Sequence, residues 1–414
     1  MYRSYKFSLR PTAKQTRLLN EMLGDFCDLY NGALENRKMS WKDRKISVSY
    51  NEQCAQLTQI RAEMPEFRRW SAAAERDPIR RVDLGFQSFF RRIKLGQTPG
   101  HPRFRGKGWY DSATFDPKSG SRWNTSNYGN KPVRRSKNFK STTVTVYLQG
   151  IGHVKVRQHR EVKGDIKTIT VKRQGKKWFV DLCCGNVPKD ILPKTGESAG
   201  IDVGINVYAM TDSGYVIENP KYAKVSQDKV SDLRHSLSKK KFGSNNRKKA
   251  KAKLNKATQK VKNQREDFQY KAAIDLIRRY DTIYLEDLSV KNMLESDGKF
   301  GKKNKTKLNY GIADAGWADF AKKITYKAES AGKLVIFVNP AYTSRTCSKC
   351  GFISADNRNG IYFKCLSCGF KIHADKNAAI NIKSRGQGMS SQDRDLSIEP
   401  IIIDEKGSHG MWEK

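Results

Sequence analysis

Two pairs of cysteines near the C-terminus have the spacing of a metal site. Cys347 and Cys350 form one Cys-x-x-Cys pair, and Cys365 and Cys368 form a second pair after fourteen intervening residues. Each pair bends two thiolates toward one metal, and a hairpin between the pairs brings all four together, so the spacing predicts a tetrahedral zinc ribbon. Because four thiolates leave no position for water, we expect this zinc to be structural.

Three acidic residues interrupt or adjoin apolar segments, and they form a second candidate site. Asp202 lies within the apolar run 199–210, Glu286 ends the run that starts at Thr282, and Asp375 follows the last cysteine by seven residues. An ionised carboxylate in such a setting is costly unless it is paired or binds a cation. Hard oxygen ligands favour Mg²⁺ or Mn²⁺, and two such ions about 4 Å apart can cleave a phosphodiester. For each acid alone, a salt bridge or a helix cap is the alternative.

The charge of the chain indicates a polyanionic partner. Its 414 residues include 80 Lys and Arg against 42 Asp and Glu, a formal net charge of +38. This excess favours nucleic acid. A basic membrane-surface or ribosomal protein is the alternative, but 37% hydrophobic residues and seven Trp argue for a folded chain with aromatic stacking surfaces.

Several features predict a soluble intracellular protein. No apolar stretch approaches the 18 residues of a membrane span, and the start of the chain alternates like a strand rather than like a signal peptide. The length allows roughly two to four domains. The remaining cysteines lie in apolar contexts, which predicts buried thiols and no disulfide framework: Cys27, Cys54, Cys183 and Cys184.

The N-terminal half predicts helices between strands. Thr12 and Gln15 form a capping box that should start a helix, and helical periodicity continues in pieces to about residue 95. From roughly 140 to 185 the pattern alternates, which predicts antiparallel strands in a small barrel. Residues 97–140 are rich in Gly, Pro, Arg and Lys and predict long irregular loops suited to nucleic-acid contact.

A proline-rich joint at 187–193 predicts a domain boundary, after which apolar strands carry the acids. The first of these is one continuous strand over 199–210, which turns at 212–214 into a partner strand at 215–217. Residues 223–279 are helical and basic, with a break at Phe242–Ser244 that predicts a helical hairpin. We expect a mobile loop over Asp297–Lys307, a helix opened by 315–317, a strand at 334–338, and a last helix that begins at Asp375.

These residues carry a resemblance to a known family. Four segments together look like the RuvC-type motifs and inserted zinc ribbon of TnpB proteins: Gly200–Gly204, Tyr284–Leu288, Pro340–Cys347 and Ala374–Ile382. TnpB is the accessory protein of certain insertion-sequence transposons and is related to the type V CRISPR effectors. Further matches are Pro102–Arg105, Asn245–Ala250, Gln264–Phe268 and Asp314–Trp317. The resemblance spans residues 1 to 385, and its motifs are specific in combination.

The resemblance implies an α/β multidomain fold. In it, an RNase H-like (RuvC) nuclease domain is interrupted by the zinc ribbon, and a wedge-like β-barrel carries an inserted helical recognition domain. The corresponding ranges are 1–10 and 96–193 for the barrel, 11–95 for the recognition domain, 194–344 and 371–385 for the nuclease domain, 345–370 for the ribbon, and 386–414 for a disordered tail.

The resemblance also implies an activity. The protein would bind a guide RNA transcribed from its own element, pair that guide with double-stranded target DNA, and cut both strands beside a short adjacent motif. Asp202, Glu286 and Asp375 would be the catalytic acids that hold two Mg²⁺ ions, with Mn²⁺ as a possible substitute. We expect a monomeric ribonucleoprotein in the prokaryotic cytoplasm, in which backbone charge holds the duplex and base pairing supplies sequence specificity.

Other candidate contacts stay open at this stage. The basic runs of the helical hairpin either contact phosphates or are solvated faces, and basic residues of the ribbon either contact DNA or surround a purely structural clip. His373, which precedes Asp375, is either solvent-facing or functional. The basic residues concerned are Lys239–Lys241, Arg247–Lys249, Arg345, Lys349 and Lys364.

Rival functions are distinguishable by simple observations. A RuvC-like transposase or resolvase would act without guide RNA and would purify free of a defined transcript. A nuclease-inactive, RNA-guided DNA-binding regulator would have no need of costly acids in apolar strands, so the intact acidic set argues against it. A CRISPR effector would differ from a transposon protein in its genomic neighbours.

Overall fold

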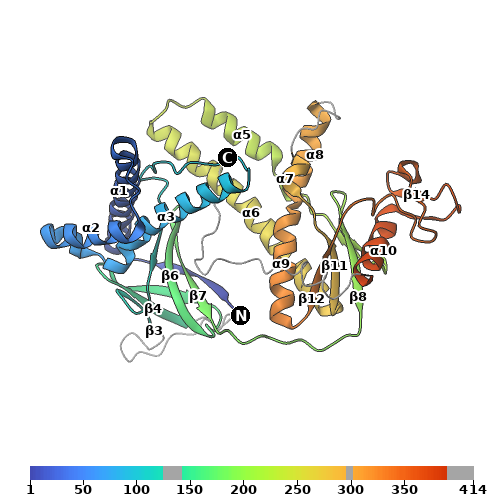
Figure 1. Ribbon diagram of the computed structural model, residues 1–414, viewed down its shortest axis with the longest axis horizontal. Helices are drawn as coiled ribbons and strands as arrows, with labels where there is room; N and C mark the ends of the chain where they lie inside the picture. Colours follow the sequence, from blue (N-terminus) through green and yellow to red (C-terminus); the bar gives the residue numbers. More distant parts are fainter. Residues whose placement is uncertain (125–141, 295–301, 389–414) are drawn as a thin grey trace. The chain divides into compact units, whose positions relative to one another are not determined.

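The computed structural model describes residues 1–124, 142–294 and 302–388, and the chain forms two compact units (Figure 1). The first unit is Met1–Pro188 and the second begins at Lys189. No described helix is long and apolar enough to cross a membrane.

The first unit contains a seven-stranded antiparallel sheet that nearly closes into a barrel. Its strand order is β2-β6-β7-β1-β5-β4-β3, and a tight turn at Asp116–Gly120 links the two edge strands. In β1, Tyr5, Phe7 and Leu9 alternate into the core. The strands predicted at the start of the chain and over about 140–185 are confirmed. The bounds of all seven are β1 Arg3–Arg10, β2 Ser112–Phe115, β3 Ser121–Asn124, β4 Thr142–Leu148, β5 Gly152–Gln158, β6 Asp165–Gln174 and β7 Lys177–Gly185.

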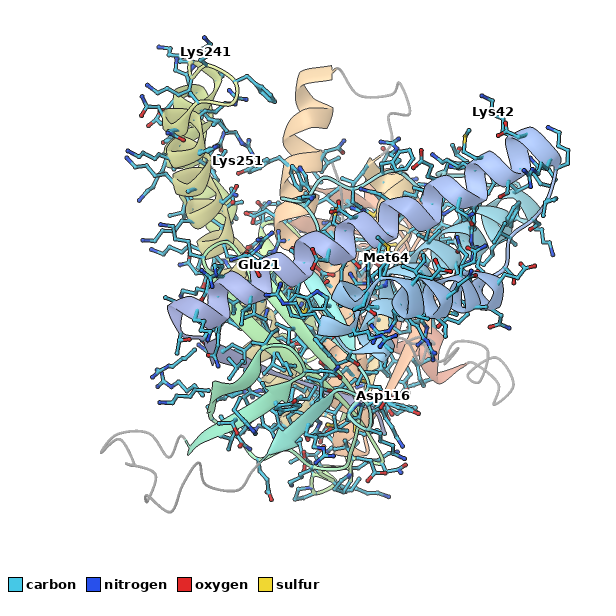
Figure 2. The ribbon with its side chains drawn as sticks, turned by 90° about the vertical axis from the view of Figure 1, so that its left-hand side faces the viewer. Glu21, Lys42, Met64, Asp116, Lys241 and Lys251 are labelled. Carbon is cyan, nitrogen blue, oxygen red and sulfur yellow. The ribbon has the colours of Figure 1, made fainter. Side chains whose placement is uncertain are left out.

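Three α-helices follow β1 and complete the core of this unit. Thr12 and Gln15 form the predicted capping box, since the Gln15 N–H donates to Thr12 Oγ1 at 3.2 Å and the Thr12 N–H donates to Gln15 Oε1 at 3.1 Å. Figure 2 labels Glu21 and Lys42 along α1. The helices are α1 Ala13–Arg44, α2 Tyr50–Glu63 and α3 Ala72–Lys94, with a 3₁₀ turn at Pro65–Arg69.

The expectation of irregular loops over 97–140 is only partly correct. Residues 112–115 and 121–124 form β2 and β3, each four residues long. Such short strands give little periodicity, and their pairing with β6 and β4 comes from the tertiary structure. The basic segment 125–141, which we also expected to be a loop, lies outside the described residues.

The second unit contains a five-stranded mixed sheet in the order β10-β9-β8-β11-β12. Strand β8 is antiparallel to β9 and parallel to β11, which is in turn parallel to β12. The strands predicted at 215–217, 282–286 and 334–338 are confirmed, but the single strand predicted over 199–210 is wrong, because the chain turns after Val203 and pairs with itself as an antiparallel hairpin. The bounds are β8 Ser198–Val203, β9 Val207–Thr211, β10 Val216–Glu218, β11 Thr282–Glu286 and β12 Leu334–Val338.

Helices cover both faces of this sheet (Figure 1). On one face, α6 (Asn245–Arg279) packs with α9 (Trp317–Ala331) over Ile283 and Leu285 of β11. On the other face, α10 (Ala374–Gln387) packs against β8, β11 and β12. Tyr284 of β11 and Ile382 of α10 belong to the smaller hydrophobic core on this face. Successive side chains of β11 therefore point alternately into two hydrophobic layers, one on each face of the sheet.

Helices α4 (Tyr222–Val225) and α5 (Gln227–Ser238) precede α6, and α5 packs on α6 as the predicted hairpin. After β11, α7 spans Val290–Leu294 and α8 spans Lys302–Ala315. The expected loop over Asp297–Lys307 is therefore wrong from Lys302 onward, because Lys-rich sequence is compatible with a helix. Residues 295–301 lie outside the described part.

The cysteine pairs lie in turns beside a small sheet, here called the cysteine sheet, that lies between β12 and α10 in the chain. It is formed by β13 (Arg358–Asn359), β14 (Tyr362–Lys364) and β15 (Lys371–His373), all antiparallel. A last helix begins at Ala374, one residue before Asp375, as expected. This helix continues to Gln387, so residues 386 and 387 do not belong to a tail, and residues 389–414 lie outside the described part.

Candidate active site and metal centre

Asp202 and Glu286 lie side by side at the ends of two neighbouring strands. In the parallel pairing of β8 with β11, Ile201 is opposite Leu285, so the two acids are the next residues on their strands. Residues in matched positions of adjacent parallel strands point to the same face of the sheet. The sheet register thus brings together two acids that are far apart in the sequence.

Helix α10 reaches this face because glycines leave room for its backbone. A Cβ at Gly200 would collide with the backbone carbonyl of Ala379 and lie 2.6 Å from the backbone N of Lys383. A Cβ at Gly386 would collide with the ring of Tyr284. The absence of both side chains lets α10 lie directly on β8 and β11, which places its first turn near the ends of these strands.

Asp375 lies in that first turn, and His373 is the residue that caps it. The Asp375 N–H is 3.3 Å from His373 Nδ1, which accepts the hydrogen bond. The open question about His373 is therefore answered in part: its ring is the N-cap of α10. At the other end of the helix, Lys383 Nζ forms an ion pair of 2.8 Å with Asp212 Oδ2 and ties α10 to the sheet.

The three acids share an electrostatic environment. Burial and the negative charges of Glu286 and Asp375 raise the pKa of Asp202 well above its usual value, and the positive charge of Arg358 opposes this shift. Burial also raises the pKa of Glu286, against a hydrogen bond from Thr343 and the charge of Arg385. The rise at Asp202 comes first from burial, which disfavours the charged carboxylate, and then from the like charges beside it.

Two residues that the sequence did not single out hold the acids in place. Arg358 Nη2 is 2.8 Å from Asp375 Oδ1, and the Thr343 hydroxyl donates to Glu286 Oε1. Thr343 is buried, and it lies in the Pro340–Cys347 segment that resembles a family motif. Arg358 lies on β13 of the cysteine sheet, and nothing in its sequence context distinguishes it from the other cations of a basic chain.

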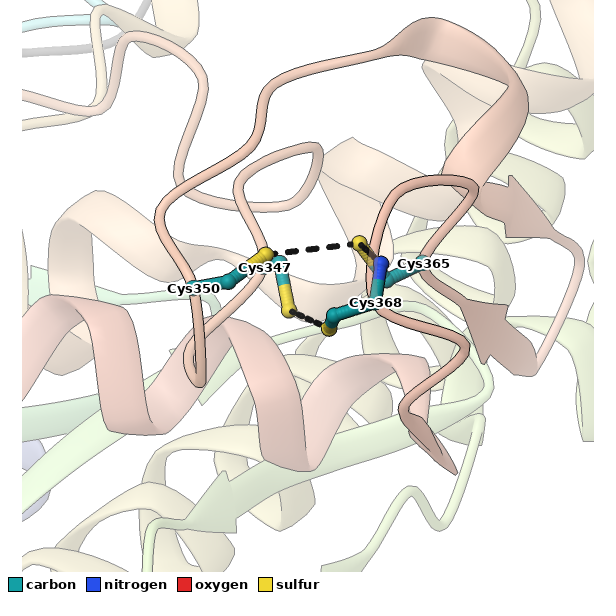
Figure 3. A group of neighbouring side chains, drawn as sticks. All are labelled: Cys347, Cys350, Cys365 and Cys368. Carbon is teal, nitrogen blue, oxygen red and sulfur yellow. Dashed lines mark hydrogen bonds between the residues drawn. The ribbon is translucent and has the colours of Figure 1, made fainter.

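The four predicted zinc ligands converge on one point (Figure 3). Their Sγ atoms all lie within 4.8 Å of one another, with 3.8 Å between Cys347 and Cys368 and 3.6 Å between Cys350 and Cys365. A tetrahedral site with Zn–S bonds of about 2.3 Å places sulfur atoms about 3.8 Å apart. The cysteines therefore fit one tetrahedral metal ion, and they are free rather than disulfide-bonded.

Two asparagines of α10, of which Asn377 is buried, connect this helix to the metal centre. Asn377 of α10 donates to the Thr346 carbonyl at 2.8 Å and accepts from the Ser348 N–H at 3.0 Å. Asn381, one turn later, donates to the carbonyls of Thr343 at 2.8 Å and Thr346 at 2.7 Å. The segment that carries Thr343 and the first cysteine pair is thus fixed to the helix that carries Asp375.

A third asparagine joins the two cysteine pairs. Buried Asn357 donates to the carbonyls of Arg345 and Phe352, and its Oδ1 accepts from the Leu366 N–H at 3.0 Å. This residue precedes Arg358 directly. The position of Arg358 therefore depends on the same interactions that hold the cysteine loops together.

The carboxylates form a looser set than the cysteines. Among the described residues, the four cysteines form a group of possible metal ligands whose donor atoms all lie within 4.8 Å of one another, and the three carboxylates do not. Asp202, Glu286 and Asp375 are each half-buried, and the charges of Glu286 and Asp375 act on Asp202. Such an oxygen donor set fits hard divalent cations, and two ions about 4 Å apart would not require all three carboxylates to touch a single ion.

The predicted nucleic-acid contacts of the cysteine sheet remain predictions. Arg345, Lys349 and Lys364 are exposed, as are the large apolar side chains Tyr362 and Leu366 beside them. Exposure is compatible both with contact to DNA and with a structural clip surrounded by solvent. Neither alternative is distinguished by the contacts of these side chains.

Three family models match separate parts of the chain. A model described as "Probable transposase" matches residues 182–297, and one described as "Cas12f1-like, TNB domain" matches residues 317–382. A "Helix-turn-helix domain" model matches residues 1–45, which the structure forms as strand β1 and the single helix α1.

Comparisons with individual proteins find relatives that match over most of this chain or over part of it. The chain is 26% identical to the "Putative RNA-guided DNA endonuclease InsQ" of Escherichia coli (strain K12), over 96% of this chain and 97% of that protein. It is 30% identical to the TnpB-like protein L79 of Acanthamoeba polyphaga mimivirus, over 48% of this chain and 39% of that one. A solved Cas12f1–sgRNA–target DNA complex aligns over 92% of this chain and 98% of its own, at 17% identity and a TM-score of 0.33.

Proposed function

This chain belongs to the TnpB family, and from that premise we propose that it is an RNA-guided endonuclease that cleaves double-stranded DNA beside a short adjacent motif. The observation that carries the proposal is the sheet register that sets Asp202 beside Glu286, where burial and the charges of Glu286 and Asp375 together raise the pKa of Asp202. Acids placed together at the ends of neighbouring strands repel one another and so lower the stability of the fold. Such a group is therefore better explained by the binding of cations.

The second unit would be an RNase H-like nuclease domain of the RuvC type, spanning 194–344 and 371–385. Its mixed sheet, with β9 antiparallel to β8 and with β11 and β12 parallel, supports this assignment. The cysteine sheet would be the ribbon inserted at 345–370. In the first unit, the barrel over 1–10 and 96–193 would be the wedge domain, and 11–95 the recognition domain.

Asp202, Glu286 and Asp375 would hold two Mg²⁺ ions, for which Mn²⁺ could substitute. When bound, such ions supply an activated water and stabilise the leaving 3′ oxygen of the phosphodiester. The chain's own residues orient the ligands: the Thr343 hydroxyl fixes one oxygen of Glu286, and Arg358 fixes one oxygen of Asp375. Arg358 also supplies a positive charge where phosphate oxygens would gather negative charge.

The four cysteines would hold a structural zinc. All four positions of a tetrahedral ion would be filled by thiolates, which leaves no site for water or substrate. Because Asn357 and Asn377 connect the cysteine loops to each other and to α10, metal binding would also order Arg358 and Thr343. Zinc would therefore support cleavage indirectly, through the orientation of the acids' partners.

The nucleic acids would be bound mainly through charge. A net charge of +38 suits a guide RNA paired with a target strand, because phosphates are held by Lys and Arg without regard to sequence. Base pairing would then select the target, and side chains would contact only the short adjacent motif. The prokaryotic relative fits action in the cytoplasm of a prokaryotic cell.

Purification of the full chain with co-expressed guide RNA would test the proposal. We expect Mg²⁺-dependent linearisation of a plasmid that carries the guide-matched target, and no cleavage with Asp202→Ala. The conservative Asp287→Asn is a suitable control, since Asp287 follows Glu286 and is exposed. Equal cutting by Asp202→Ala would refute the site assignment.

The same preparation discriminates among the rivals. Cleavage or strand transfer without a copurifying transcript would support a transposase or resolvase. Guided binding without cleavage in Mg²⁺ or Mn²⁺ would support a nuclease-inactive regulator.

A further inference from the structure

Helices α5 and α6 form a projection that has almost no core of its own. We call residues 227–265, which comprise α5, the connecting turn and the first part of α6, the basic arm. No residue of α5 is buried, and the buried residues of α6 begin at Gln269. Figure 1 shows the two helices side by side, away from the sheet of their unit. Burial of apolar surface therefore does not explain why the chain maintains this projection.

The charge of the basic arm is entirely of one sign over most of its length. Between Asp232 and Glu266 the chain has thirteen Lys and Arg and no Asp or Glu. Figure 2 labels Lys241 and Lys251 on this projection, where lysine side chains extend outward. Like charges four residues apart destabilise a helix, and α6 contains three such pairs: Arg247 with Lys251, Lys249 with Lys253, and Lys256 with Lys260. A polyanion bound along the arm would remove this repulsion.

The tip of the basic arm presents a single aromatic ring. Phe242 is 90% exposed, the highest value among the large hydrophobic side chains that are described. It follows directly after Lys239–Lys241, and Gly243 turns the chain with a φ of 78°. Phenylalanine is rarely left this open to water without a partner, because its transfer to an apolar contact is favourable.

The turn that carries Phe242 is held in one conformation. Arg247 Nη1 donates to the carbonyls of Leu237 and Lys240, each at 3.0 Å, and its guanidinium lies 5.7 Å from the centre of the Phe242 ring. Ser244 caps α6, with its Oγ accepting from the Arg247 N–H at 3.1 Å. The exposure of the ring is therefore built into the turn rather than left to a loose loop.

We propose that the basic arm binds a single-stranded segment of nucleic acid, with Phe242 stacked on one of its bases and Lys239–Lys241 in contact with the adjacent phosphates. An aromatic ring among lysines matches the two components of a nucleotide, its flat base and its anionic backbone. An apolar groove on a protein would accept the ring but would leave the surrounding cations without counter-charges. The proposal goes beyond the endonuclease activity, because it holds whether or not the chain cleaves DNA.

Binding measurements on the full chain without Mg²⁺ would test the proposal. The probes are labelled single-stranded DNA and RNA of the same sequence, about 30 nucleotides long, a DNA duplex, and heparin, which carries negative charge but no bases. The variants are Phe242→Ala, Phe242→Trp and, as a control, Val225→Ala, which alters an apolar side chain of the same unit that is 80% exposed. Fluorescence anisotropy at about 0.15 M salt gives the dissociation constants.

We expect Phe242→Ala to weaken binding of at least one single strand by about five- to hundredfold, the loss of one stacked base. Binding of the duplex and of heparin should change less than twofold, Phe242→Trp should bind like the wild type, and Val225→Ala should have no effect. Whichever of DNA and RNA is weakened identifies the strand that the arm holds.

A charge variant separates stacking from phosphate binding. Lys240→Gln combined with Lys241→Gln should weaken the binding of every polyanion. For single strands, the slope of log K against log salt concentration should become shallower by about 1.4, or 0.7 for each phosphate that is no longer neutralised. The proposal would be overturned if Phe242→Ala bound both single strands like the wild type, or if it lost as much affinity for heparin. Failure of the cleavage assay would leave these results unaffected, so the two proposals fail independently.

Discussion

Gly200→Ala should separate DNA cleavage from DNA binding. A Cβ at Gly200 would lie 2.6 Å from the backbone N of Lys383, and even closer to the carbonyl of Ala379, whereas such contacts essentially never fall below 3.0 Å. The backbone of α10 must then shift by more than about 0.4 Å, the difference between 3.0 and 2.6 Å. Because the obstacle is backbone rather than a flexible side chain, the helix cannot accommodate the methyl group by a rotamer change.

The shift would act on Asp375, which lies in the first turn of the same helix. A misplacement of about 1 Å in a catalytic group costs roughly 10²-fold in rate, so we expect cleavage to fall by roughly 10- to 100-fold. Overpacking costs about 1–3 kcal/mol, less than the stability of a typical domain, so the unit should stay folded. Guide RNA and target DNA should bind as in the wild type, because the altered contact lies between a helix and a sheet.

Single-turnover cleavage by the purified ribonucleoprotein measures this effect, with metal content and target binding measured on the same samples. Gly388→Ala is the matched control, since a Cβ at this end of α10 would have ordinary contacts of 3.6 and 3.7 Å. The reasoning fails if Gly200→Ala cleaves at the wild-type rate, or if Gly388→Ala is impaired to the same extent.

Three further predictions concern individual contacts. Arg358→Ala should reduce cleavage by roughly 10²-fold without loss of metal from the cysteines, because Asp375 loses its ion-pair partner. Arg358→Lys should recover only part of the rate, and Lys371→Ala, an exposed residue of the same small sheet, should cleave like the wild type. Cys365→Ser should abolish zinc in elemental analysis and cleavage with it, whereas Cys54→Ser, outside the cluster, should leave both intact. Burial raises the pKa of Glu75 in α3 to about 7 despite its ion pair with Arg61. The folded state then holds a proton that the unfolded chain releases near pH 4.5, so stability should fall by roughly 3 kcal/mol as pH rises from 4.5 to about 7 and stay level above it. Hydrogen exchange of α3 amides at pH 5 and pH 8 would measure this slope, and an equal slope in Glu75→Gln would contradict the assignment.

The elements that carry the candidate site were predictable because each has a strong local pattern. Apolar runs interrupted by one acid predicted β8 and β11, and the Cys-x-x-Cys spacing predicted the cluster at Cys347–Cys368. The capping box at Thr12 predicted the start of α1 to the residue. In these places local preference and tertiary structure agree, which is the condition under which sequence patterns are informative.

The residues that hold the site were not predictable, since their partners are distant in sequence. Thr343 meets Glu286 and Arg358 meets Asp375 only after the cysteine sheet has folded against α10. One Arg among 80 basic residues carries no local signal of its role. Strands β2 and β3 were missed for a related reason, because four-residue strands depend on their neighbours in the barrel for pairing.

The connection between the cysteine sheet and the acids has a consequence for how activity depends on folding. Arg358 and Thr343 are held by loops whose geometry depends on Asn357, Asn377 and Asn381, and those loops close only when the four cysteines converge. A structural metal contributes folding free energy directly, so its binding would order the partners of Glu286 and Asp375 at the same time. Loss of that metal should then leave the five-stranded sheet folded but release Arg358 from Asp375. The two metal sites are therefore coupled through protein conformation, even though neither shares a ligand with the other.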